Sequence, residues 1–185
     1  MTYTERLISI ISSESFKADV KILMTKLIEA KQHQRTIYIF GNGGSGSTAS
    51  HWANDFTKGM SYGNVPDNRF KMICLNDNMP IISAISNDAD YSEIFVEQLK
   101  NFLTPTDIVI GISGSGNSMN VVKAFEYANQ VGAETIAIVG FDGGKLRNVA
   151  QWPLHIMIND MGVFEDVSLI IDHIIFDAYK QGVFK

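Results

Sequence analysis

The sequence predicts an α/β domain in which a five-stranded parallel sheet of the flavodoxin-like type has helices on both faces. Three observations lead to this prediction: short apolar runs alternate with helical segments, glycine-rich turns follow two of these runs, and 185 residues suit one domain. Strands that alternate with helices favour parallel pairing. In such sheets, ligands bind beyond the carboxyl ends of the strands, where the strand order reverses.

The expected elements follow from apolar periodicity. Runs with strand character cover 36–40, 70–75, 107–112, 135–139 and 154–158. Helical spacing covers 46–58, 79–100, 118–131, 143–149 and 163–181. The helical segment 79–100 is expected to break near Asn87-Asp88.

A long first helix is expected over residues 4–31, where apolar residues recur at helical spacing from Leu7 to Ile28. These residues lie on more than one side of the helix, and one face of a sheet would not bury them all. We therefore predict that residues 1–35 form a helical segment used in oligomerisation. Residues 36–185 form the α/β core of the same single domain, which spans 1–185.

Composition narrows the function. The net charge is −5, so the surface repels nucleic-acid phosphates at long range, and any phosphate site must be built locally from backbone N–H groups and hydroxyls. The single cysteine, Cys74, excludes an internal disulfide. The N-terminus shows no signal-peptide pattern, and no apolar run approaches the ~18 residues of a membrane helix. A cytoplasmic protein with no membrane or nucleic-acid partner is expected.

Two loops rich in glycine and serine are the strongest functional signal. Residues 41–47 follow the first strand and residues 113–118 follow the third, each before a helix. Glycines let the backbone approach an anion, the helix N-terminus presents N–H groups, and serines add neutral donors. One such loop can be only a tight turn, but two in one small domain favour phosphate binding.

The loops favour a single sugar phosphate over a nucleotide. Neither contains the lysine of a Walker A loop. Residues 41–46 approximate the dinucleotide fingerprint, but no acidic residue ends a second strand ~20 residues later. No nucleotide cofactor is therefore expected.

Several motifs in sequence order resemble the SIS (sugar isomerase) domain of phosphoheptose isomerases. They are Gly41-Asn42-Gly43-Gly44-Ser45, His51, Asn87-Asp88, Gly111-Ile112-Ser113-Gly114-Ser115-Gly116-Asn117-Ser118 and Gly140-Phe141-Asp142-Gly143-Gly144-Lys145-Leu146. The resemblance runs from about residue 36 to the C-terminus. It implies substrate or phosphate contacts from Asn42, Gly43, Gly44, Ser45, Asn87, Asp88, Ser113, Gly114, Ser115, Ser118 and Glu165.

The same resemblance implies an aldose–ketose isomerase. The reaction would convert sedoheptulose 7-phosphate to D-glycero-D-manno-heptose 7-phosphate, a precursor for bacterial lipopolysaccharide or capsule. A homotetramer with active sites between subunits is also implied. The alternatives are a non-catalytic SIS protein that binds a replication initiator, an SIS isomerase for another sugar phosphate, and a sugar-phosphate sensor, although no DNA-binding segment precedes the domain.

Four residues form the candidate acid–base or metal set. His51 and Asp55 are four apart and share a helix face, while Glu165 and His173 are eight apart on the last helix. Two imidazoles and two carboxylates suit Zn²⁺ and suit acid–base chemistry equally. From spacing alone, His51 can be a surface residue, and His173, among isoleucines, can be a packing residue. The resemblance implies functional roles, with Asp55 where the family has glutamate.

The alignment of the last helix is ambiguous by one residue. We prefer the register that matches Glu165 and His173 to the family's metal and catalytic positions, with Ser168 where the family often has histidine. The rival register would put Phe164 and Asp172 at those positions and destroy the site.

The expected mechanism moves a proton between C1 and C2 through an enediol. This chemistry needs a base near carbon and a donor or cation near the oxygens. We expect Asp55 to be the base and His173 to act on the oxygens, with one Zn²⁺ per subunit held by His51, Asp55, Glu165 and His173. A metal-bound carboxylate is a weaker base, so the two roles of Asp55 compete.

Overall fold

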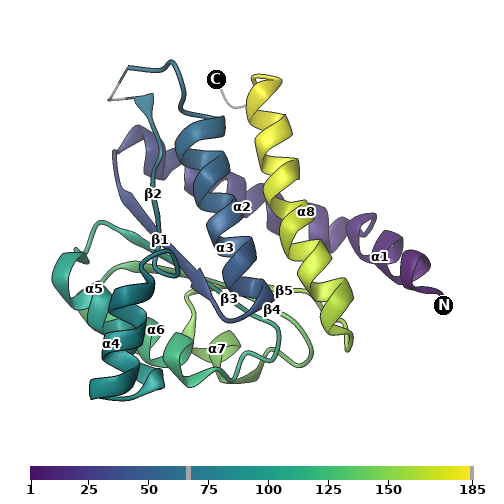
Figure 1. The fold of residues 1–185 in the computed structure, drawn as a ribbon. Coiled ribbons are helices and arrows are strands. Elements are labelled where there is room, and N and C mark those ends of the chain that lie inside the picture. The colour runs from purple at the N-terminus through teal and green to yellow at the C-terminus, as the bar shows by residue number, and fades with distance from the viewer. Residues whose placement is uncertain (66–67, 184–185) are drawn as a thin grey trace.

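Five parallel strands form the centre of the molecule, as the sequence predicts (Figure 1). The computed structural model describes residues 1–65 and 68–183. The strands are β1 (Thr36–Gly41), β2 (Lys71–Cys74), β3 (Ile108–Ser113), β4 (Glu134–Val139) and β5 (Trp152–His155). Their order is β2-β1-β3-β4-β5, and every neighbouring pair is parallel. This is the flavodoxin-like order, in which the direction of strand addition reverses between β1 and β3.

Helices cover both faces of this sheet. They are α1 (Tyr3–Ile11), α2 (Glu14–Gln32), α3 (Gly44–Asn54), α4 (Met79–Asp88), α5 (Val96–Phe102), α6 (Met119–Val131), α7 (Gly144–Val149) and α8 (Met161–Lys180). The described residues also form the π-helical turn η1 (Asp55–Gly59) and the 3₁₀ turn η3 (Tyr91–Glu93).

The two-residue period of the strands divides the core into two layers. In β1, Ile37 and Ile39 pack with α2, α3 and α8, whereas Tyr38 and Phe40 pack with α5, α6 and α7. Both faces of the strand are apolar because both are covered by helices. On the first face, α3 and α8 lie side by side (Figure 1).

The expected long N-terminal helix is two helices, α1 and α2, so the single helix predicted over 4–31 was wrong. The break falls at Ser12 and Ser13. The Ser13 hydroxyl accepts the N–H of Phe16 and thereby caps α2, while Ser12 ends α1. Serine side chains that bond to nearby backbone favour such ends over a helix interior.

Other boundaries differ by a few residues. The region 79–100 breaks after Asp88 into α4, η3 and α5, as expected. Strand β5 covers Trp152–His155, which is earlier than the predicted 154–158. Helix α3 ends at Asn54, and the chain continues as the wider turn η1 from Asp55.

Candidate active site

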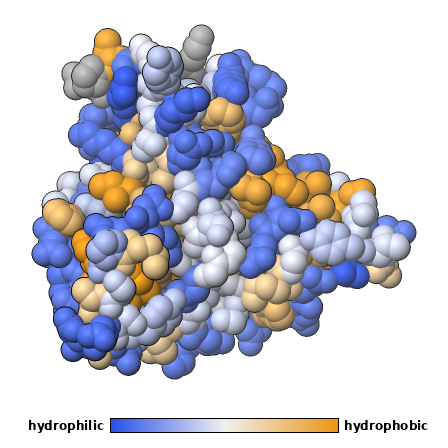
Figure 2. Space-filling model, viewed as in Figure 1, coloured by the Kyte–Doolittle hydropathy of each residue, from blue (hydrophilic) through white to orange (hydrophobic). Residues whose placement is uncertain are grey.

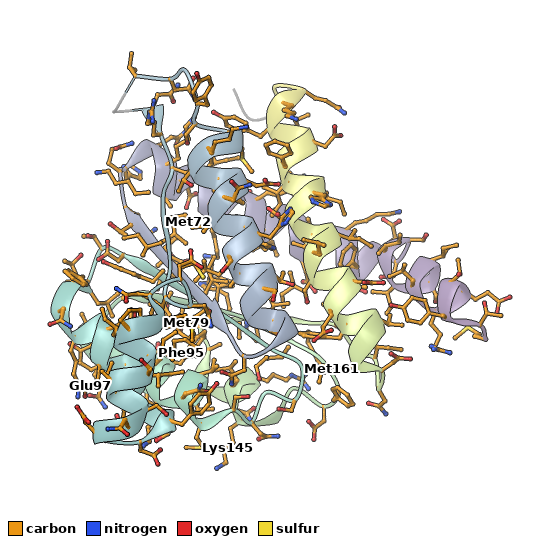
Figure 3. All side chains as sticks on the ribbon, in the orientation of Figure 1. Met72, Met79, Phe95, Glu97, Lys145 and Met161 are labelled. Atoms are coloured by element: carbon orange, nitrogen blue, oxygen red, sulfur yellow. The ribbon has the colours of Figure 1, made fainter. Side chains whose placement is uncertain are left out.

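The two glycine–serine loops meet at the carboxyl edge of the sheet and line one cavity of about 260 Å³. Nine of the predicted binding residues line it: Asn42, Gly43, Gly44, Ser45, Ser113, Gly114, Ser115, Ser118 and Glu165. Ile112 and Met161 complete the lining, and Met161 is labelled at the start of α8 in Figure 3. The loops come from β1 and β3, between which the strand order reverses.

Two of the helices that begin at this cavity, α3 and α6, have no side-chain caps. Gly43 and Ser118 occupy the cap positions of α3 and α6, and neither makes a side-chain cap hydrogen bond. By contrast, Ser13 and Asp160 cap α2 and α8 with their own oxygens. The N–H of Gly46 bonds to the carbonyl of Asn42, and the N–H of Val121 bonds to Oδ1 of Asn120. The N–H groups of the first two residues of α3 and of α6 are left for another acceptor, and the helix dipoles favour an anion there.

Close packing between the first loop and α8 explains one of its glycines. A methyl group at Gly44 would overlap the carboxylate of Glu165. Gly43, just before it, has φ = 54°, in the left-handed region that favours glycine. The sequence of the loop thus lets the Glu165 carboxylate lie directly against its backbone.

The predicted contacts from Asn87 and Asp88 are not part of this cavity. Both residues are exposed at the end of α4, where the Asn87 amide donates to the Asp88 carboxylate over 2.7 Å. The segment that follows does reach the site, because the hydroxyl of Tyr91 donates to Oδ1 of Asn42 over 3.0 Å.

A second group of polar side chains lies between α3 and α8. Nε2 of His51 is 3.2 Å from Nε2 of His173 and 3.6 Å from Oδ2 of Asp55. Asp172 completes the group, with its Oδ2 3.9 Å from His51 Nε2. One ligand atom from each of the four residues lies within 4.8 Å of the others. The structure thus brings all four residues together, although 117 positions separate Asp55 from Asp172 in the sequence.

Asp172 is the buried member of the group. Its side chain has no exposed surface, and neither carboxylate oxygen has a hydrogen-bond partner within the described part of the chain. Burial, followed by repulsion from the Asp55 carboxylate, raises the pKa of Asp172 to about 8. An unpartnered buried carboxylate of this kind requires a proton or a cation for compensation.

These residues fit a Zn²⁺ ion. Two imidazoles and two carboxylates match the N and O ligands that zinc takes, and the unsatisfied oxygens of Asp172 point to a missing positive partner. The ligand set differs from the predicted one. Among the described residues, the group contains Asp172 and does not contain Glu165, which lies against the first loop.

Asp172 belongs to the rival alignment of the last helix, which the sequence analysis rejected in favour of the one with Glu165 and His173. The structure shows that Asp172 and His173 are both part of the group. Neighbouring helix positions point about 100° apart, but the ligand atoms of both side chains still lie within 4.8 Å of those of His51 and Asp55. His173 is exposed beside His51 and is not enclosed in an apolar core. The sequence did contain a signal for Asp172, because a carboxylate stands in the otherwise apolar run Ile170-Ile171-Asp172-His173-Ile174 next to a candidate ligand.

Comparisons with known proteins agree with this architecture. The family described as SIS domain matches residues 2–140. A phosphoheptose isomerase of Trichlorobacter lovleyi is 38% identical over 167 residues, which cover 90% of this chain and 84% of that protein. A phosphoheptose isomerase of Helicobacter pylori strain P12 is 34% identical over 177 residues, which cover 92% and 87%.

Solved structures show the same fold. A phosphoheptose isomerase from Francisella tularensis has a TM-score of 0.81 at 21% identity and covers 97% of this chain and 91% of its own. The Neisseria gonorrhoeae phosphoheptose isomerase has a TM-score of 0.78 at 24% identity, with the same coverages. Within residues 1–65 and 68–183, no helix combines the length and apolar character needed to cross a bilayer. The chain belongs to the SIS-domain family and, within it, to the phosphoheptose isomerases.

Proposed function

We propose that this enzyme converts sedoheptulose 7-phosphate to D-glycero-D-manno-heptose 7-phosphate through an enediol. The observation that supports this most directly is the spacing of two unlike regions along α3 and α8. A cavity lined by the uncapped starts of α3 and α6 suits the phosphate. A histidine–aspartate group farther along α3 and α8 suits proton transfer. The related phosphoheptose isomerases support the same reaction class.

The phosphate is expected over the second loop. Ser113, Ser115 and Ser118 supply hydroxyl donors, and the first turn of α6 supplies backbone N–H groups. The lining of this cavity has no lysine or arginine among the described residues. Glu165 would repel the phosphate, so we assign it to a sugar hydroxyl, from which its carboxylate can accept a hydrogen bond.

Proton transfer is assigned to Asp55 and His173. Asp55 takes the proton from one carbon and returns it to its neighbour, while His173 moves a proton between the two oxygens. The hydrogen bond between Nε2 of His51 and Nε2 of His173 needs one donor and one acceptor nitrogen. In the metal-free protein this bond therefore couples the tautomers of the two rings, and it can form only while neither Nε2 holds a metal.

Zn²⁺ is proposed as the metal, with His51, Asp55, Asp172 and His173 as the residues that hold it. When bound, it would polarise the substrate oxygens and stabilise negative charge on them. Asp172 suits ligation better than catalysis, because it is fully buried and lies behind the exposed imidazoles. Asp55 belongs to the same group, so its roles as a metal ligand and as a base compete.

We further propose a cytoplasmic homotetramer that makes heptose precursors for bacterial surface polysaccharide. Apolar side chains exposed on the N-terminal helices support the assembly, namely Ile8 at 52% exposure and Ile22 at 47%. Figure 2 shows apolar surface gathered where α1 projects from the body of the molecule. We expect light scattering at micromolar concentration to give a tetramer, and a monomeric mass contradicts this proposal.

The test of the proposed reaction is direct. The pure protein is incubated with sedoheptulose 7-phosphate, with and without Zn²⁺, and the aldose is followed by NMR. In deuterated water, transfer through an enediol exchanges the proton at C2 of the product with solvent. Arabinose 5-phosphate and fructose 6-phosphate serve as comparison substrates. Preferred turnover of either one, or absence of turnover with any, contradicts the proposal.

A further inference from the structure

A pair of asparagine side chains joins the two phosphate loops. Asn42 belongs to the first loop, and Asn120 lies in the first turn of α6, directly after the second loop. Nδ2 of Asn120 donates to Oδ1 of Asn42 over 2.8 Å, and Nδ2 of Asn42 donates back to Oδ1 of Asn120 over 3.0 Å. Asn120 is 2% exposed. We call these two side chains the amide pair.

A backbone donor fixes the orientation of the amide pair. The N–H of Val121, which can only donate, bonds to Oδ1 of Asn120 over 3.0 Å. Nδ2 of Asn120 must then face Asn42, whose oxygen accepts this bond and a second one from the hydroxyl of Tyr91. Reversing either amide would place donor against donor or acceptor against acceptor.

The hydrogen-bonding capacity of Asn42 is nearly exhausted by these contacts. Its oxygen accepts two hydrogen bonds, and one of its two amide protons is donated. At most one N–H remains for a substrate. The side chain of Asn42 therefore serves mainly to hold the first loop against α6, and the loop contacts the substrate chiefly through its backbone.

The partners of the amide pair are themselves anchored. Lys123, three residues after Asn120 on the same helix, donates to the hydroxyl of Ser92 over 2.6 Å and pairs with Glu93. These contacts hold η3, the turn that contains Tyr91, against α6. The first loop and η3, from separate parts of the chain, thus both contact the first two turns of α6.

We infer that Asn120 is a positioning residue that sets the spacing of the two phosphate loops across the substrate cavity. Asn120 does not line the cavity and acts through Asn42. Because the loops bind the phosphate with backbone and hydroxyl groups, a shift of either loop misaligns several donors together. This inference rests on the proposed function of the cavity as a sugar-phosphate site.

The test compares two asparagines on the same helix. Asn129, near the other end of α6, donates to the carbonyl of Val149 and accepts from the hydroxyl of Thr135. Asn120→Ala and Asn129→Ala each remove a hydrogen-bonded amide and should lower the melting temperature. We expect only Asn120→Ala to raise KM for sedoheptulose 7-phosphate, by about tenfold, with kcat within about threefold of wild type. Equal KM values for the two variants overturn the inference.

A double substitution separates a shared role from two independent ones. If Asn42 and Asn120 act through each other, the variant with alanine at both positions raises KM about tenfold, as each single variant does. A KM that rises about a hundredfold in the double variant, the product of the two single effects, overturns the inference, because it means that the two side chains act independently. Tyr91→Phe removes one of the two bonds to the Asn42 oxygen and should have a smaller effect in the same direction.

Binding of inorganic phosphate, measured by titration calorimetry, separates this inference from the proposed reaction. We expect Asn120→Ala to weaken phosphate binding and Asn129→Ala to leave it unchanged. A wild-type protein that binds phosphate but does not isomerise the sugar contradicts the reaction, and the same dissociation constants still decide the role of Asn120. A wild-type protein that binds no phosphate overturns both.

Discussion

The proposed phosphate cavity and the histidine–aspartate group both use α3 and α8, yet they are built from different chemistry. The cavity also uses the second loop before α6, and the group also uses Asp55 at the start of η1. The cavity is formed mainly by glycines, serines and backbone at the helix starts. The group farther along consists entirely of titratable side chains within 4.8 Å of one another. Binding is thus assigned to backbone geometry and catalysis to side chains, so substitutions in the two regions should affect different kinetic constants.

The largest expected effect is on turnover. Asp55→Asn keeps the size of the side chain and removes the proposed base, so kcat should fall by about 10²–10⁴-fold. Binding of sugar phosphate, measured by calorimetry, should stay close to that of the wild type, because the cavity is unaltered. An Asp55→Asn enzyme with normal kcat contradicts the mechanism, whatever its affinity.

The converse effect is expected in the cavity. Ser115→Asp puts a negative charge where the phosphate dianion is expected, so KM should rise by about tenfold or more through like-charge repulsion. Ser115→Ala is the matched control, which removes the hydroxyl without adding charge and should raise KM less. Steady-state kinetics at constant ionic strength measure both variants. Equal KM values for Ser115→Asp and wild type place the phosphate elsewhere.

Metal affinity distinguishes Asp172 from Glu165, both of which lie on α8. Asp172→Asn should weaken Zn²⁺ binding by about 10–100-fold, whereas Glu165→Gln should change it by less than about threefold. Competition with a chromogenic chelator measures both affinities without reference to activity. Loss of affinity in Glu165→Gln alone restores the ligand set that the sequence predicts and removes Asp172 from the site.

The smallest expected effect is a change in the free energy of unfolding with pH in the metal-free protein. The pKa of Asp172 is about 8 in the folded chain and near 3.9 when unfolded, so the folded state binds the proton more tightly. Its stabilising contribution is complete below about pH 4 and is lost as pH rises toward 8, by up to about 1.4 kcal/mol per pH unit.

Chemical denaturation in the presence of chelator measures this slope between pH 5 and 8. Asp172→Asn has no titrating group at this position and should flatten the slope. Zn²⁺ should raise the stability of the wild type most at high pH, where the carboxylate is ionised. An unchanged slope in the variant shows that another group is responsible.

Much of the fold follows from the sequence. The five strands, the break after Asp88 and the positions of both loops are visible in apolar periodicity and in glycine placement, because these are local properties of the chain. The break at Ser12 and Ser13 was missed although its signal is also local. Apolar spacing continues through the two serines, and that spacing outweighed their capping preference.

The sequence by itself determined the strand–helix alternation, the two glycine–serine loops and the identity of His51, Asp55 and His173 as candidates. Only the tertiary structure decided which carboxylate joins them. Glu165 and Asp172 are seven residues apart on one helix, about two turns, and helical spacing places both on nearly the same side. The packing of α8 against α3 directs Glu165 to the first loop and buries Asp172 beside His51, because each position faces a different level of the neighbouring helix. Burial, which no spacing along the chain specifies, then gives Asp172 its unusual pKa.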